Sequence, residues 1–173
     1  MQFEMDDALE VLKATPSVLD ALLRGKSSAW LNSRKTPESF SPLDVLGHLI
    51  HGEITDWIPR VRIILEHRDT RVFDPFDRFA FSELIAGKPV EDLLAEFAHL
   101  RREGLQTLSE LGVAENELNL PGMHPGLGRV TMSNLLAAWA VHDLGHISQI
   151  VKTMACEYRE AVGPWTPYLS ILD

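Results

Sequence analysis

The stretch NLLAAWAVHDLGHISQIVKTMA, residues 134–155, decides the fold because it contains no proline and only one glycine. Apolar side chains recur in it at spacings of three and four, which predicts a long uninterrupted helix. His142 and His146 are four residues apart and therefore lie on the same side of this helix. Both fall at the edge of the apolar stripe that contains Leu135 and Trp139. Two half-buried imidazoles need partners, which are either hydrogen-bonding groups or a metal ion.

Three more segments show the same helical spacing, and two long links containing Pro and Gly connect the later ones. No segment alternates as a strand over any length, and no internal repeat is present. The fold class predicted is all-α, a four-helix bundle with at least one long crossover connection. The four helices are expected at about 6–24, 41–66, 89–111 and 131–158.

Several residues mark where these helices start, bend and end. Thr15-Pro16 predicts a kink or a restart in the first helix, with Thr15 as the N-cap. Ser41 opens an S-x-x-D capping box and starts the second helix. Pro59 lies inside that helix without a backbone donor, so we expect a bend there. Gly112 ends the third helix.

Composition limits the class of protein. A chain of 173 residues with 45% hydrophobic content fits one domain, residues 1–173. The formal net charge of −9, without a Lys/Arg cluster, argues against nucleic acid and anionic membranes as partners. Cys156 is the only cysteine, which excludes an intrachain disulfide and fits a reducing cytoplasm. No signal-peptide pattern or run of about 18 apolar residues occurs, so we expect a soluble, cytoplasmic protein.

The second helix contains GHLIHGE, residues 47–53, and with it two candidates for a third ligand, His48 and His51. Its densest apolar stripe lies nearly opposite His48. Either His48 is a surface residue, or it faces a cavity while the stripe faces another subunit. The second alternative predicts a homodimer, because a monomeric bundle does not easily bury both sides of one helix. The stripe consists of Leu46, Ile50, Ile54, Trp57, Val61 and Ile64.

Three neutral imidazoles suit a divalent ion such as Zn²⁺ or Ni²⁺ and leave coordination positions open. Two other metal sites fit less well. HDLGH resembles the zincin helix H-E-x-x-H, but Asp143 replaces the glutamate that acts as general base. A di-iron bundle requires paired Glu-x-x-His motifs, and the sequence has none. Cys156 is ten residues from His146, about 15 Å along a helix, and does not belong to the site.

Several other side chains have both an ordinary and a functional interpretation. His124, in the loop before the last helix, is either solvated or near the mouth of the site. Arg60, Arg62 and Arg68 are most simply a solvated face, although they also suit the carboxylates of an anionic thiol. Some aromatic residues either pack in the core or line an apolar substrate pocket. They are Trp57, Phe73, Phe76, Phe79 and Trp139.

The chain resembles the DinB-like superfamily, and more closely its DinB_2-type branch. The resemblance extends over nearly the whole chain, from ATPSVLDALLRG onward, and rests on three longer strings. It implies a bundle in up-down-down-up order, often dimeric, with a divalent metal on one histidine of the second helix and an H-x-x-x-H pair of the fourth. The implied ligands are His48, His142 and His146. The strings are FSPLDVLGHLIHGEITDWIPRVR, HPGLGRVTMSNLLAAWAVHDLGHISQI and YREAVGPWTPYLSIL.

The resemblance also implies an activity, because relatives include metal-dependent transferases and isomerases that use a low-molecular-weight thiol such as bacillithiol or mycothiol. The leading hypothesis is an enzyme whose metal binds such a thiol and directs it at a small-molecule substrate, with Asp143, His51 or Glu53 orienting ligands or relaying protons. One alternative is a hydrolase that uses metal-bound water. A non-enzymatic alternative is a dimeric metal-binding or stress-response module.

Overall fold

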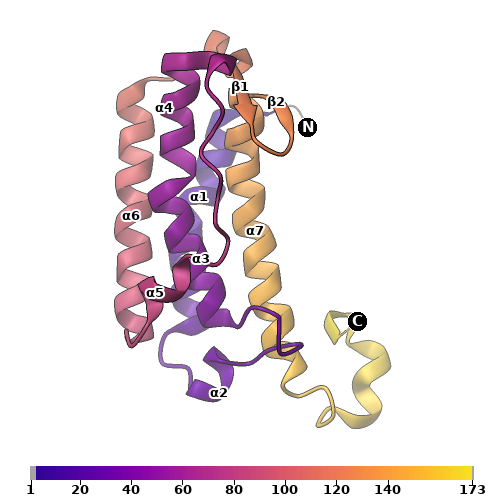
Figure 1. Cartoon of the computed structure of the whole chain (residues 1–173). Coiled ribbons are helices and arrows are strands. Elements are labelled where there is room, and N and C mark those ends of the chain that lie inside the picture. The colour runs from indigo at the N-terminus through magenta and orange to yellow at the C-terminus, as the bar shows by residue number, and fades with distance from the viewer. Residues whose placement is uncertain (1–2, 173) are drawn as a thin grey trace.

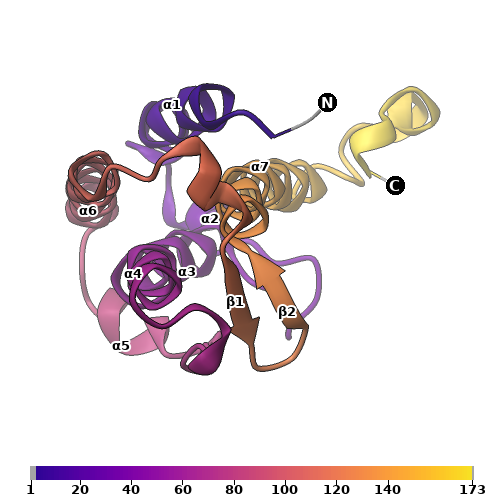
Figure 2. The ribbon, with the colours of Figure 1, turned by 90° about the horizontal axis from the view of Figure 1, so that it is seen from above.

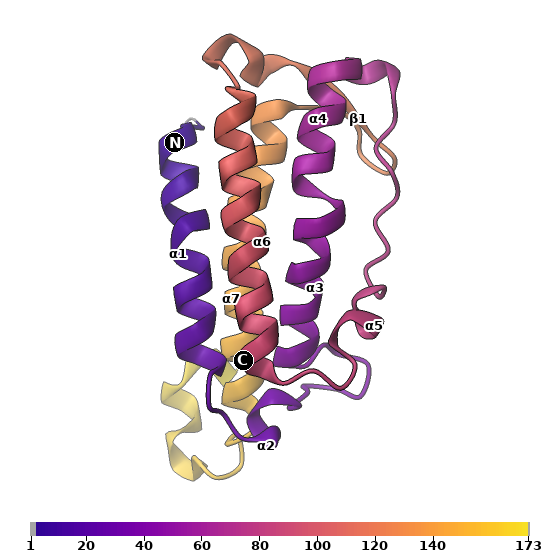
Figure 3. The ribbon, with the colours of Figure 1, turned by 90° about the vertical axis from the view of Figure 1, so that its left-hand side faces the viewer.

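The computed structural model describes residues 3–172, and its long helices form four columns (Figures 1 and 2). Seen from above, the order around the bundle is α1, α6, the α3–α4 column and α7. α1 and α7 run in one direction, whereas the α3–α4 column and α6 run in the other (Figure 3). The predicted all-α bundle with up-down-down-up order is confirmed. The helices are α1 (Met5–Leu23), α3 (Pro42–Thr55), α4 (Trp57–His67), α6 (Val90–Leu111) and α7 (Met132–Cys156).

Short elements fill the links between the columns. The expectation of no strands is wrong at one place, because residues before α7 form a two-stranded antiparallel hairpin in which His124 pairs with Gly128. Gly128 has a φ of 75°, the left-handed region that such a tight hairpin needs. The additional elements are α2 (Ser28–Leu31), α5 (Phe81–Ile85), strands β1 (Pro121–His124) and β2 (Gly128–Thr131), and 3₁₀ turns at Arg68–Thr70, Glu115–Asn119, Gly163–Tyr168 and Ser170–Leu172.

The link between α4 and α6 is the crossover connection. It returns along the outside of the α3–α4 column before α6 begins, so that both columns run in the same direction (Figure 3). α5, within this link, packs on α3, and Gly47 of α3 has no room for a Cβ because Ile85 and Phe81 would lie 2.5 and 3.0 Å from it. The crossover therefore covers a second side of α3 within one chain.

This cover corrects the expectation about the apolar stripe of α3 and α4. Of its six residues only Ile54 is exposed, and the other five are buried. His48, on another side of α3, is buried as well. A second subunit is not needed to explain either side, so the argument from this stripe no longer supports a homodimer. The homodimer itself stays a prediction.

Helix boundaries follow the local signals closely. Ser41 forms the predicted capping box with Asp44, and Gly112 ends α6 with a φ of 60°. The predicted bend at Pro59 lies slightly earlier, at Asp56, because Pro59 cannot donate to the carbonyl four residues before it. The predicted restart at Thr15 is wrong, since α1 continues through Pro16.

Two groups of buried apolar side chains stabilise the bundle, one near each end. The first includes Trp57, Trp139 and Phe73, and the second includes Phe40, Phe81 and Phe97. His48 of α3 packs against Phe40 and Phe81 of the second group, and His142 of α7 packs against Trp57 of the first. Among the described residues, none of the helices combines the length and the apolar character that crossing a lipid bilayer requires.

Candidate metal centre

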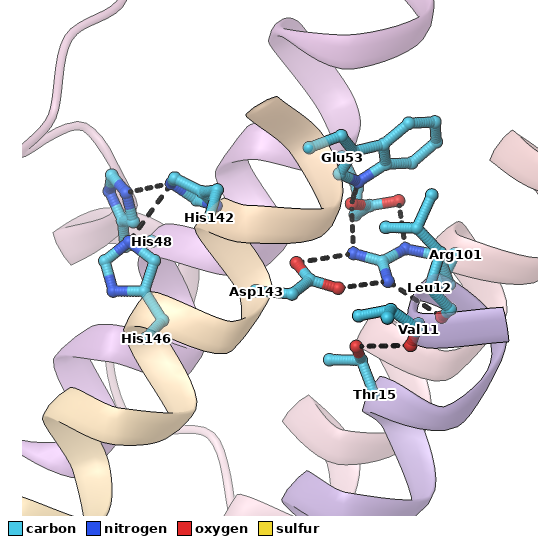
Figure 4. A network of polar contacts seen from close by, with 10 residues as sticks. Val11, Leu12, Thr15, His48, Glu53, Arg101, His142, Asp143 and His146 are labelled. Atoms are coloured by element: carbon cyan, nitrogen blue, oxygen red, sulfur yellow. Dashed lines mark hydrogen bonds and ion pairs between the residues drawn. The ribbon is translucent and has the colours of Figure 1, made fainter. Parts of the chain in front are cut away.

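The fold brings His48 of α3 next to His142 and His146 of α7 (Figure 4). The two columns are antiparallel neighbours, so residues 94 apart in sequence face each other across their contact. His48 is 7% exposed and the other two rings are partly buried. One ring nitrogen of each residue lies within 4.8 Å of the corresponding nitrogens of the other two. The alternative that His48 is a surface residue is therefore wrong.

The Nε2 atom of His142 lies close to the Nε2 atoms of both other rings. His142 Nε2 lies 3.2 Å from His48 Nε2 and 3.1 Å from His146 Nε2. Zn–N bonds of about 2.0–2.1 Å in a tetrahedral site would place two nitrogen ligands about 3.3 Å apart. Both separations match that value within a few tenths of an ångström, and the ligand nitrogens of all three residues lie within 4.8 Å of one another, which are dimensions that suit one divalent ion.

The remaining ring nitrogens are consistent with this arrangement. Nδ1 of His146 lies 2.9 Å from Oε1 of Gln149, to which it donates when Nε2 carries the lone pair. Nδ1 of His48 and Nδ1 of His142 form no hydrogen bond of normal geometry with any described residue. When Nε2 of each ring carries its lone pair, the neighbouring lone pairs repel one another, and a cation between them removes this repulsion.

The environment keeps the rings neutral. Burial lowers the pKa of His48 to about 4, with a further reduction from His146, although the main chain of Arg78 acts in the opposite direction. Burial lowers the pKa of His142 to about 3, and its two histidine neighbours add to the effect. The pKa of His146 is lowered by burial as well, against the hydrogen bond to Gln149. Neutral imidazole is the form that binds a metal ion.

Aromatic side chains surround the three histidines. Phe76, from the crossover, meets His48 edge-on with ring centroids 5.3 Å apart, and Trp57 meets His142 edge-on at 5.1 Å. Trp139 stacks on Trp57 and points away from the histidines, because its Nε1 donates to Glu53. Phe79 is mostly exposed at 58%. Of the aromatic residues singled out in the sequence, Trp57 and Phe76 are thus in direct contact with the candidate site.

The three residues predicted to act in proton transfer lie outside the cluster. His51 packs beside Phe76, with ring centroids 4.9 Å apart, at the edge of the site. Asp143 and Glu53 are buried on the other side of α7, where both bind Arg101 of α6 (Figure 4). The predicted roles of His51, Asp143 and Glu53 in proton transfer stay predictions. The two carboxylates have a partner within the protein, Arg101, with which both form ion pairs.

Sequence reasoning missed Arg101 and Gln149. Arg101 lies on the apolar stripe of α6, four residues after Phe97 and seven before Leu108, and a charged residue at such a position signals a buried partner. Gln149 lies three residues after His146 on the same helix, which is the spacing of side chains that touch.

The structure also tests the expectations for the arginines of α4 and for His124. Arg60 is 8% exposed and lies 2.5 Å from Asp56, so it does not belong to a solvated face, whereas Arg62 is exposed as expected. His124 is partly buried rather than fully solvated, and its ring faces Phe73 edge-on.

Comparisons with known proteins agree with this fold. The solved structure of YfiT from Bacillus subtilis, described as a probable metal-dependent hydrolase with an unusual four-helix bundle topology, is similar with a TM-score of 0.74. The two share 21% identity, and the match covers 92% of this chain and 87% of YfiT. TT2238, described as a four-helix bundle protein, is similar with a TM-score of 0.61 and 22% identity, over 86% of this chain and 98% of that one.

At these identities the solved structures establish the fold alone. No curated protein matched the sequence. The family model of the DinB superfamily matches residues 12–150, a span that contains His48, His142 and His146 and most of the chain. The chain therefore belongs to the DinB superfamily.

Proposed function

We propose that this protein is a metal-dependent enzyme that holds one divalent ion, Zn²⁺ or Ni²⁺, on His48, His142 and His146. The close approach of Nε2 of His142 to Nε2 of His146 and of His48, at 3.1 and 3.2 Å, is the observation that carries the proposal. Three nitrogen ligands leave coordination positions open, as in catalytic rather than structural sites. An ion bound there would act as a Lewis acid that lowers the pKa of a thiol or of water.

The surrounding residues have distinct tasks in this proposal. Gln149 accepts from Nδ1 of His146 and so fixes the tautomer that offers Nε2. Trp57 and Phe76 pack against the histidine rings and limit the access of water. His51, whose ring packs beside Phe76 at the edge of the site, is the side chain that relays protons. Asp143 and Glu53 act through Arg101, by holding α7 and α3 in register.

The leading nucleophile is a low-molecular-weight thiol, which makes the protein an S-transferase for a small electrophile. Membership of the DinB superfamily supports this choice through the thiol-dependent activities implied for its relatives. A second candidate is hydrolysis by metal-bound water. The likeness to YfiT, described as a probable metal-dependent hydrolase, favours that candidate.

A single titration distinguishes the two. Protein made without a histidine tag is loaded with Co²⁺ and titrated with bacillithiol, mycothiol, glutathione or a simple thiol. A coordinated thiol is deprotonated by the ion, so the transferase predicts a new sulfur-to-metal charge-transfer band. Ion binding without such a band, for any of the thiols, contradicts the transferase and leaves the hydrolase.

The control concerns the ion itself. His142→Ala is expected to lose both the ion and the spectral change. His99→Ala removes an exposed histidine of α6 and is expected to keep both. Elemental analysis that finds no ion in the wild-type protein, even after incubation with Zn²⁺ or Ni²⁺, contradicts every metal-dependent function.

A further inference from the structure

A second feature lies beside the histidines, a cavity of about 180 Å³ between α4 and α7. Phe73 of the crossover and Leu127 of the β1–β2 hairpin contribute to its lining. Gly122 of β1 is packed so tightly that a Cβ there would lie 2.7 Å from Phe73 and 2.8 Å from Ile64, which fixes the position of the Phe73 ring. For scale, an engineered cavity of about 150 Å³ holds benzene. The cavity therefore accepts a ring or a short aliphatic chain.

Arg60 lines this cavity from α4. Its Nε is held by Asp56 at 2.5 Å, and its guanidinium stands 5.2 Å from the centre of the Phe73 ring. The closest contact of this ion pair uses Nε, and within residues 3–172 the terminal Nη atoms form no hydrogen bond of normal geometry with a protein acceptor. A guanidinium offers five N–H groups, and the outer ones are the pair that binds a carboxylate through two parallel hydrogen bonds.

Two more hydrogen-bond donors line the same cavity. Nδ1 of His124 accepts from the backbone N–H groups of Gly126 and Leu127, both at 3.1 Å, so the neutral ring carries its hydrogen on Nε2. Oδ1 of Asn134 accepts from the backbone N–H of Thr131 at 3.1 Å, which leaves its Nδ2 as a donor. Arg60 and His124 lie close enough for the charge of Arg60 to contribute to lowering the pKa of His124, after the larger effect of burial.

The polar lining is thus one-sided. Arg60, His124 and Asn134 contribute donors, and no Asp or Glu side chain lines the cavity. Asp56 pairs with Arg60 from outside the lining, but in a chain with a formal net charge of −9 a cavity lined by three donors and no carboxylate favours an anion over a cation. The rest of the lining is apolar or aromatic, which suits the body of the ligand.

The cavity adjoins the metal centre. Trp57 is a wall of the cavity and also touches His142, with ring centroids 5.1 Å apart. Ala138, another lining residue, precedes His142 by one turn of α7, about 6 Å along the helix axis. A ligand that fills the cavity therefore has one end within about one helical turn of the three histidines.

We propose that this cavity binds a small carboxylic acid with an apolar body, with the carboxylate on Arg60 and His124 and the other end toward the histidines. The acid is then the substrate class of the metal centre. That last step rests on the proposed function, whereas binding of the carboxylate does not.

Benzoate and its neutral analogue benzamide test the proposal in metal-free protein. Two-dimensional NMR follows the backbone amides of Leu127 and Ala138 during titration. Benzoate is expected to shift these signals and to bind at least about tenfold more tightly than benzamide, because its carboxylate accepts charge-assisted hydrogen bonds that the neutral amide cannot match. Equal affinities, no binding, or shifts confined to other regions would overturn the proposal.

Variants identify the groups responsible. Replacing Arg60 alone would leave Asp56 buried without its partner, so Asp56→Asn is combined with Arg60→Gln. This pair is expected to abolish the preference for benzoate, and Arg62→Gln, on the exposed side of α4, is expected to preserve it. If the double variant does not fold, His124→Gln should weaken benzoate binding severalfold, and Ala138→Leu, which fills the cavity, should prevent binding of both probes. Unchanged benzoate binding in these two variants would also overturn the proposal.

Failure of one proposal is distinguishable from failure of the other. Benzoate binding in protein that takes up no Zn²⁺ or Ni²⁺ contradicts the metal-dependent function and keeps the carboxylate site. Metal uptake without discrimination between benzoate and benzamide contradicts the carboxylate site and keeps the metal-dependent function.

Discussion

α7 separates two buried polar clusters that differ in how completely their hydrogen-bonding groups are used. On one side, Arg101 directs its five N–H groups to Glu53, Asp143 and the carbonyl of Leu12, at distances of 2.5–3.1 Å. On the other side, the three histidines direct nitrogen atoms at one another. The Arg101 cluster is saturated by protein groups, whereas the histidine cluster fits a further ligand.

The two clusters are also physically connected. His142 and Asp143 are consecutive, so α7 sends one side chain into each cluster. Arg101 ties Asp143 of α7 to Glu53 of α3, which follows His48 by five residues. It also reaches α1, where Pro16 has no N–H for the Leu12 carbonyl and leaves it free to accept from Arg101. The saturated cluster thus fixes the helices that carry the histidines.

If the Arg101 cluster is structural, its loss gives the largest effect on stability. Arg101→Met would leave the carboxylates of Glu53 and Asp143 buried without a counter-charge, and we expect the free energy of unfolding to fall by about 3–5 kcal/mol. Arg101→Lys keeps the charge but not the paired geometry and should lose less. Arg102→Met, at the exposed neighbouring position, should change stability by no more than about 0.5 kcal/mol. Urea unfolding of metal-free protein measures all three, and equal stability of Arg101→Met and wild type would contradict the structural role.

The histidine cluster should respond to metal instead. At a free Zn²⁺ concentration about 1,000 times its dissociation constant, the wild type should gain about 4 kcal/mol, because only the folded state assembles the site. His142→Ala should gain almost nothing, while His99→Ala should gain as much as the wild type. Thermal unfolding with and without Zn²⁺ measures the gain. Equal stabilisation of His142→Ala would show that the ion binds elsewhere.

The two clusters were not equally predictable from sequence. Helix positions, the Ser41 capping box and the Gly112 terminus follow from local chemistry, and the spacing of His142 and His146 places them on one side of a helix. His48 was ambiguous because its helix is buried on several sides by the crossover, and the register of that long link is not encoded in helical spacing. Membership of the family, rather than periodicity, pointed to it.

Long-range pairing explains the other differences. The partners of Arg101 are 48 and 42 residues away, and no local pattern specifies which carboxylates a buried arginine meets. The continuity of α1 through Pro16 was missed for the same reason, because the freed carbonyl finds its partner on another helix. Helical spacing leaves Arg60 either on a solvated face or facing an anionic thiol, because the break at Asp56, which changes the direction of the following side chains, cannot be located to the residue from Pro59 alone.

Acid should affect the metal-free histidine cluster more than the Arg101 cluster. The folded-state pKa values of about 4 for His48 and 3 for His142 lie below the unfolded value of 6.5, so the unfolded state binds more protons between these limits. Stability therefore rises with pH in this window and is lost on acidification, by about 1 kcal/mol for each ring between pH 6.5 and 5.5. Urea unfolding across this range should show a smaller pH dependence in His142→Ala, and an unchanged slope would contradict the burial of a neutral ring.

The smallest effect concerns Gln149. Its side chain combines the two roles, because it uses a hydrogen bond within the protein to position a metal ligand. Gln149→Ala removes the acceptor of His146 Nδ1, and loss of such a partner weakens metal binding about tenfold or somewhat more. Gln149→Glu places a charged acceptor there and should restore or exceed the wild-type affinity. Ser148→Ala, at the exposed preceding position, serves as the control. Competition with a chelator of known affinity measures all four proteins, and equal metal affinity in Gln149→Ala would show that the ring of His146 is held by packing alone.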